Sequence, residues 1–144
     1  MKSYFPDINV WVALVYEGHA HHPIAQHWFD GLQNERLYFS RLTQLGFLRL
    51  LTHATVMRSD VKNSRQAWLV YDALLQDVRI SFSNEPGNAE LARLFRSFST
   101  AGEISPQRWS DAYLAAFARA WEFELVTFDR ALANLSRSSA VLLH

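Results

Sequence analysis

Short apolar segments alternate along this chain with segments of helical periodicity, and this alternation constrains the fold more than any other feature. The strands expected from it are 2–5, 37–39, 78–82, 125–128 and 141–143. Strands that are separated by helices of about ten residues pair in parallel through right-handed crossovers. The sequence therefore predicts an α/β fold, a three-layer α/β/α sandwich with a central, mostly parallel sheet.

The helical segments are bounded by recognisable start and stop residues. Pro23 is typical of a first helical position. Asn63 or Ser64 is a candidate cap for a helix over 65–76, and Ser110 is a candidate cap for a long apolar helix. The expected helices are 8–16, one from Pro23 to near Gly31 or Asn34, 41–53, 65–76, 89–98, 111–124 and a short one after Asp129. In the third of them, Leu42, Leu45 and Leu48 share an apolar face.

Length and composition narrow the class of protein. With 144 residues, of which 49% are hydrophobic, one domain spanning residues 1–144 is expected. The chain has no cysteine, so thiol and disulfide chemistry are excluded and any metal must be held by oxygen or imidazole ligands. The uncharged run 8–16 is too short to span a bilayer, so a cytoplasmic location and no membrane partner are expected.

Three aspartates stand where parallel α/β folds place functional groups. Asp7 and Asp129 each follow an expected strand, and Asp111 opens an apolar helix. In such folds, ligands bind beyond the carboxyl ends of the strands. Asp at a helix start is common for structural reasons, because it accepts backbone N–H groups, so each aspartate taken alone is more often a cap. The joint pattern favours a common site.

That joint pattern resembles the acidic motifs of the PIN-domain nucleases. The matching segments are Asp7-Ile8-Asn9, 111–116 (DAYLAA) and 127–130 (TFDR), and their order and spacing fit nearly the whole chain. The segment 43–52, TQLGFLRLLT, and the histidine-rich stretch before Trp28 resemble one subfamily of the VapC-type toxins of toxin–antitoxin pairs.

The resemblance implies a metal-dependent endoribonuclease. Asp7, Asp111 and Asp129 would be the catalytic residues and would hold Mg²⁺ or Mn²⁺, which orients a water for attack on an RNA phosphodiester, while Asn9 and Thr127 would orient ligands or substrate. It also implies an RNA substrate, a cognate antitoxin protein and a homodimer.

Twelve of the 14 cationic residues are Arg, the better bidentate phosphate ligand, and the candidates for RNA binding are Arg41, Arg108 and Arg130. Arg49 could line an RNA groove as well, although in an apolar helix it is equally expected to pair with a buried carboxylate or a backbone carbonyl.

One residue departs from the family pattern. Many PIN nucleases place a Glu on the third helix, where this chain has Gln44. Its amide oxygen can still contact a metal or a metal-bound water, so Gln44 is assigned an orienting role. Three formal negative charges in place of four predict weaker binding of a divalent cation.

Other functions compete with the nuclease. A catalytically weakened PIN domain that binds RNA or protein is the main alternative, and Gln44 is the residue that favours it. A receiver-type phosphoacceptor would need a lysine after a late strand, and neither Lys2 nor Lys62 is there. A nucleotide enzyme would need a glycine-rich phosphate loop, which the sequence lacks. The histidines at 19, 21, 22 and 27 are expected in a solvated loop and helix start.

Overall fold

The computed structural model describes residues 2–136 and 139–144 and has a five-stranded sheet at its centre. The strand order is β3-β2-β1-β4-β5, and every neighbouring pair is parallel. The strands are β1 Ser3–Pro6, β2 Arg36–Phe39, β3 Ile80–Phe82, β4 Glu124–Thr127 and β5 Ala140–Leu142. The predicted parallel sheet is confirmed, with β5 at one of its edges.

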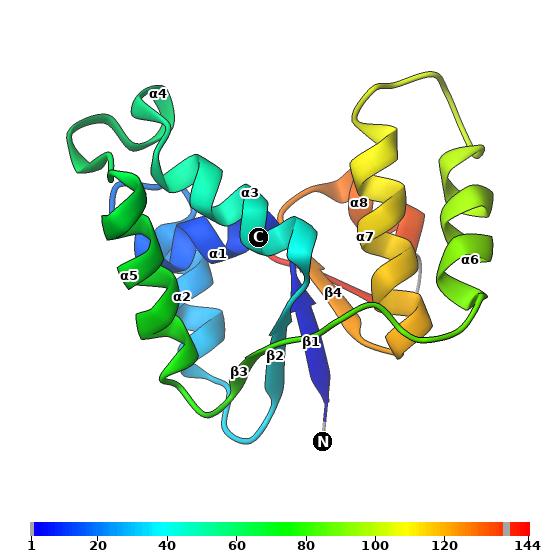
Figure 1. Ribbon diagram of the computed structural model, residues 1–144, viewed down its shortest axis with the longest axis horizontal. Coiled ribbons are helices and arrows are strands. Elements are labelled where there is room, and N and C mark those ends of the chain that lie inside the picture. Colours follow the sequence, from blue (N-terminus) through cyan, green and yellow to red (C-terminus); the bar gives the residue numbers. More distant parts are fainter. Residues whose placement is uncertain (1, 137–138) are drawn as a thin grey trace.

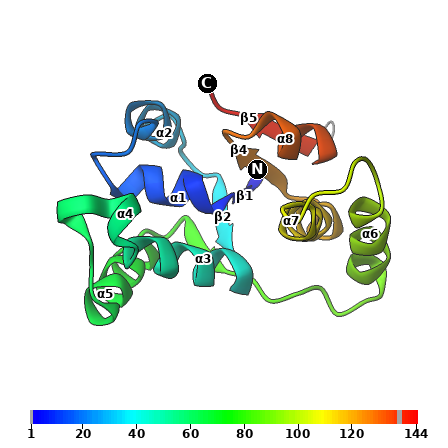
Figure 2. The same cartoon turned by 90° about the horizontal axis from the view of Figure 1, so that it is seen from above.

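Helices cover both faces of the sheet, so the predicted three-layer α/β/α class is confirmed. Helices α1 to α5 lie on one side of the sheet and α6, α7 and α8 on the other (Figures 1 and 2). Their bounds are α1 Ile8–Val15, α2 His22–Asp30, α3 Arg41–Leu51, α4 Ala54–Met57, α5 Ser64–Leu75, α6 Glu90–Ser99, α7 Arg108–Trp121 and α8 Arg130–Ser136, with a 3₁₀ turn, η1, at Arg58–Asp60. No helix within the described residues is both long and apolar enough to cross a bilayer.

Alternating side chains of the strands supply the two halves of the core. Tyr4 and Val126 point to the side of α1, whereas their neighbours Phe5 and Leu125 point to the side of α7. Because successive residues of a strand face opposite sides, both sides of a strand must be apolar when helices cover both faces. The central strands β1 and β4 are accordingly almost entirely buried.

Helix α3 buries a different face from the one its leucines suggest. The buried side chains are Thr43, Gln44, Phe47 and Leu51, while Leu45 is 62% exposed. Ser40 caps the helix, and its side chain and that of Thr43 each accept a backbone N–H of the other residue. This reciprocal cap turns Thr43 inward at the first turn and fixes which residues follow it into the core.

Smaller differences concern the ends of elements. Helix α7 begins at Arg108, so Ser110 lies inside it and is not its cap. Strand β4 ends at Thr127, one residue before the predicted end. The short α4 and η1 were not predicted, because segments of three or four residues carry no measurable periodicity.

Candidate active site

Asp7 is placed by the end of strand β1 and the start of helix α1. Its backbone N–H donates to the carbonyl of Val126, which continues the β1–β4 ladder past Pro6. One carboxylate oxygen, Oδ1, accepts the backbone N–H of Asn9 at 3.3 Å, and the other, Oδ2, accepts the hydroxyl of Thr127 at 2.8 Å. The residue is 8% exposed. Asp7 therefore has a fixed orientation and little contact with water.

Thr127 connects two of the three aspartates. It is the last residue of β4 and fully buried. Its hydroxyl donates to Asp7 and accepts the backbone N–H of Asp129 at 3.0 Å. Asp129 in turn caps α8, since its Oδ1 accepts the N–H groups of Ala131 at 2.8 Å and Leu132 at 3.3 Å. One hydroxyl thus fixes the acids that follow two neighbouring strands.

Asp111 reaches the same region from helix α7. It lies in the first turn of the helix and is half-buried. Its Oδ1 accepts the side-chain amide of Gln107 at 3.2 Å, one turn earlier. The buried residues of α7 pack against the sheet, and this packing carries the first turn of the helix to the carboxyl ends of β1 and β4.

The three aspartates and Asn9 line one cavity of about 290 Å³, which we call the acidic cavity. It lies between the starts of α1 and α7 and the middle of α3. Its other lining residues are Ile8, Gly46, Arg49, Leu50, Gln107, Ser110 and Leu114. The structure therefore brings Asp7, Asp111 and Asp129 together, although more than 100 positions separate Asp7 from Asp111 in the sequence.

Burial and the neighbouring carboxylates affect the protonation of Asp7 and Asp111. The pKa of Asp7 is raised from its ordinary value, first because burial disfavours the charged form, and further because Asp111 and Asp129 repel it; the bonds from Thr127 and Asn9 act in the opposite direction. The pKa of Asp111 is also raised, by burial and then by Asp129, against the opposing effects of Gln107 and Arg108. A cation in the cavity would relieve this repulsion.

Gln44 is not brought to the acidic cavity. It is 7% exposed, and its Oε1 accepts the guanidinium of Arg41 at 2.6 Å. The α3 residue that lines the cavity with the acids is Gly46. A Cβ atom there would meet the side chain of Ile8 at 2.3 Å, so α3 and α1 approach closely at this point. Gly46, and not Gln44, lines the acidic cavity, and glycine supplies no side chain to it.

We therefore expect Gln44→Glu to leave the affinity for Mg²⁺ or Mn²⁺ unchanged within about twofold. The new carboxylate would pair with Arg41 outside the acidic cavity, where its field at the metal is weak. Calorimetric titration of the two proteins with Mn²⁺ measures this, with Asp129→Asn as a control that should weaken binding. A clear gain in affinity for Gln44→Glu would contradict the placement.

The predicted RNA-binding arginines also lie outside the acidic cavity. Arg41 stacks over the ring of Phe82 at 4.6 Å, and Arg108 lies against the loop at Gly102. Arg130 is exposed in the first turn of α8. The cation that does line the cavity is Arg49. Its position in the sequence, one turn after Gly46, could have indicated this only if the buried face of α3 had been known.

The histidines lie on the α1–α2 side and do not form a ligand group. His21 stacks on Phe128 with ring centroids 4.4 Å apart, and His22 Nδ1 lies 2.6 Å from the carbonyl of Ala13. Among the described residues, no three acidic or histidine side chains lie close enough together to coordinate one metal ion directly. His21 and His27 are exposed, as predicted, whereas His19 and His22 are partly buried.

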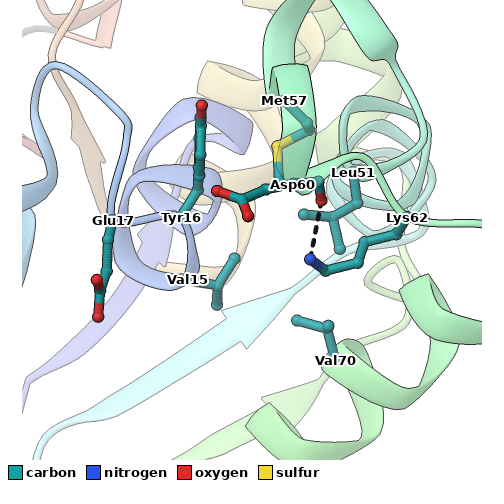
Figure 3. A pocket seen from close by; sticks show the side chains of 8 residues that line it. All are labelled: Val15, Tyr16, Glu17, Leu51, Met57, Asp60, Lys62 and Val70. Atoms are coloured by element: carbon teal, nitrogen blue, oxygen red, sulfur yellow. Dashed lines mark hydrogen bonds between the residues drawn. The ribbon is translucent and has the colours of Figure 1, made fainter.

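A second hollow, of about 250 Å³, lies at the other end of α1 (Figure 3). Glu17, Asp60 and Lys62 line it together with apolar side chains, and the ammonium of Lys62 donates to the backbone carbonyl of Asp60 at 2.8 Å. The hollow shares no lining residue with the acidic cavity. It therefore takes no part in the site formed by the three aspartates.

The acidic cavity fits a hard divalent cation. Its donors are carboxylate oxygens, and the Oδ2 atoms of Asp111 and Asp129 accept no hydrogen bond from any part of the chain that the structure describes. Mg²⁺ keeps several waters and uses only one or two protein carboxylates directly, so the acids need not converge more closely than they do. Asp7, Asp111 and Asp129 are the residues that would hold it.

Fold and site together define a parallel α/β protein with three aspartates beyond the carboxyl ends of its strands. The sequence profile of the PIN domain matches residues 4–138, and the chain belongs to the PIN-domain family. It is 42% identical to ribonuclease VapC41 of Mycobacterium tuberculosis over 133 residues. This aligned region is 89% of this chain and 90% of the relative.

Solved structures agree with this fold. VapC20 of Mycobacterium tuberculosis, described as a toxin that cleaves the sarcin–ricin loop, superposes with a TM-score of 0.68 and 16% identity over 94% of this chain and 97% of that one. FitAcB of Neisseria gonorrhoeae superposes with a TM-score of 0.56 and 19% identity, over 95% of each chain.

Proposed function

We propose that this protein is an endoribonuclease of the VapC type, and that Asp7, Asp111 and Asp129 are its catalytic and metal-holding residues. The observation that carries the proposal is that these three carboxylates, from two strand ends and one helix start, line a single cavity. The 42% identity of this chain to a ribonuclease, over nine-tenths of both chains, supports the same activity.

Divalent Mg²⁺ or Mn²⁺, when bound, would supply Lewis-acid stabilisation of the phosphodiester and activate the attacking water. The chain's own residues have separate tasks. Thr127 orients the carboxylate of Asp7 and holds the backbone of Asp129, and Gln107 orients the carboxylate of Asp111. Asn9, exposed beside Asp7, is placed to orient substrate at the cavity edge.

The test is cleavage of RNA by the purified protein, with Mg²⁺ or Mn²⁺ added and with a chelator. We expect cleavage with either metal and none with the chelator. The competing function is an RNA- or protein-binding PIN domain, which the missing side chain at Gly46 favours because α3 contributes no carboxylate to the cavity. RNA that is bound but stays intact at saturating Mn²⁺ would establish that alternative.

The proposed partners follow from the same site. A small antitoxin would present an arginine to the acidic cavity, because a guanidinium pairs bidentately with carboxylates. The VapC relationship also favours a homodimer. Light scattering of the isolated chain tests the dimer, and co-purification with the product of a neighbouring gene tests the antitoxin.

A further inference from the structure

Arg49 lies between two hollows on the surface. On one side it lines the acidic cavity, and on the other it lines a groove of about 300 Å³ between α3 and α5. The groove, which we call the α3–α5 groove, is formed by Leu45, Leu48, Arg49 and Thr52 from α3 and by Ser64, Ala67 and Trp68 from α5. A ligand that occupies both hollows must therefore pass Arg49.

The guanidinium of Arg49 is available to an anion. It is exposed, and it forms no ion pair within the described ranges 2–136 and 139–144. No carboxylate lines the α3–α5 groove, so Arg49 gives the groove a positive charge beside a cavity that is negative. A phosphate at Arg49 would find a bidentate donor at the border between the groove and the cavity whose aspartates would hold the metal.

The rest of the groove suits a flat apolar group. Trp68 is 46% exposed and Leu45 62% exposed, although both are large apolar side chains. Trp68 packs edge-on against Tyr71 with centroids 5.8 Å apart, which fixes its ring. Exposed aromatic rings beside a cation are typical of single-strand binding, where bases stack on the ring and phosphates contact the cation.

We propose that the α3–α5 groove is a subsite for the nucleotide adjacent to the cleaved phosphodiester, with Arg49 binding its phosphate and Trp68 its unstacked base. This proposal rests on the proposed ribonuclease function and extends it. The charge of the groove and its continuity with the acidic cavity through Arg49 favour RNA over an apolar peptide as its occupant.

The phosphate contact is tested by binding of a short single-stranded RNA of mixed sequence, in the Asp7→Asn protein with Mg²⁺ present so that turnover does not interfere. Arg49→Gln should weaken binding about tenfold, the size of one lost charge-assisted contact. It should also reduce the slope of log affinity against log salt by about 0.7, which corresponds to one phosphate of a single strand. Arg96→Gln, which removes an exposed arginine of α6, is the matched control and should change neither quantity.

The base contact is tested with two variants of Trp68 in the same assay. Trp68→Leu keeps an apolar side chain but removes the ring and should weaken binding at least about fivefold, whereas Trp68→Phe should stay within about twofold to threefold. Thermal melts of both should match the parent, because the ring is half exposed.

Several results would overturn the subsite: no measurable RNA binding, an unchanged affinity and salt slope for Arg49→Gln, or equal binding by both Trp68 variants and the parent. Trp68→Leu that keeps RNA affinity but no longer co-purifies with an antitoxin would assign the groove to a protein partner instead. Failure of the ribonuclease proposal is separate, since it would be seen as uncut RNA with the unmodified protein.

Discussion

Asp7→Asn is expected to lower the rate of RNA cleavage by about a hundredfold or more and, in the absence of metal, to make the protein more stable at neutral pH. The loss of rate follows from removing a buried metal-holding carboxylate, because Lewis-acid stabilisation contributes several kcal/mol and about 2.8 kcal/mol corresponds to a hundredfold. Single-turnover cleavage at saturating Mg²⁺ measures it.

The gain in stability has an independent cause. Burial raises the pKa of Asp7, so its ionised form is destabilising in the folded protein at pH 7. Asparagine has nearly the same shape without the charge, and its amide oxygen can still accept the hydroxyl of Thr127. Thermal melts in chelator should therefore show a higher Tm for Asp7→Asn than for the parent.

Asp77→Asn is the matched control for this variant. Asp77 lies outside the acidic cavity and forms an ion pair with Arg79 at 2.7 Å. This pairing lowers the pKa of Asp77. Its replacement should leave cleavage unchanged and slightly lower the Tm. Native cleavage by Asp7→Asn would exclude Asp7 from catalysis, and a lower Tm in chelator would show that its carboxylate stabilises the fold.

Addition of Mg²⁺ or Mn²⁺ is expected to raise the Tm, and to raise it more at pH 8 than at pH 5. The folded-state pKa values of Asp7 and Asp111 are raised, so the protonated forms are favoured by folding. Their contribution to stability is therefore fully present below the unfolded pKa, near 4, and is lost as the pH rises through the raised folded values. Metal binds the ionised acids and offsets this loss.

The size of the effect follows from mass action. At a metal concentration of about 100 times Kd the stabilisation is about 2.7 kcal/mol, which for a chain of this length raises the Tm by roughly 5 to 10 °C. Scanning calorimetry between pH 5 and pH 8 measures the increment. Asp129→Asn should lose most of this increment in Tm. An increment that does not change with pH, or that is as large in Asp129→Asn as in the parent, would show that the metal does not bind to these acids.

The sequence alone determined the parallel α/β architecture and the position of Asp7 and Asp129 at the carboxyl end of the sheet. The reason is that strand ends are local: Pro6 has no N–H to donate and stands at the last position of β1, and an aspartate directly after a strand starts the next helix. In a parallel sheet all strand ends of one kind lie at one edge, so Asp7 and Asp129 had to meet there. The family resemblance added the chemistry.

Only the tertiary structure decided what α3 contributes to the site. Apolar residues surround this helix on most sides, so periodicity does not determine which face is buried, and successive residues of a helix point about 100° apart. Close packing of α3 on Ile8 of α1 selects the face that places Gly46 and Arg49 at the acidic cavity and leaves Gln44 buried outside it. The same rotation leaves Leu45 exposed in the α3–α5 groove, because side chains that do not fit between α3, α1 and the sheet must point to solvent.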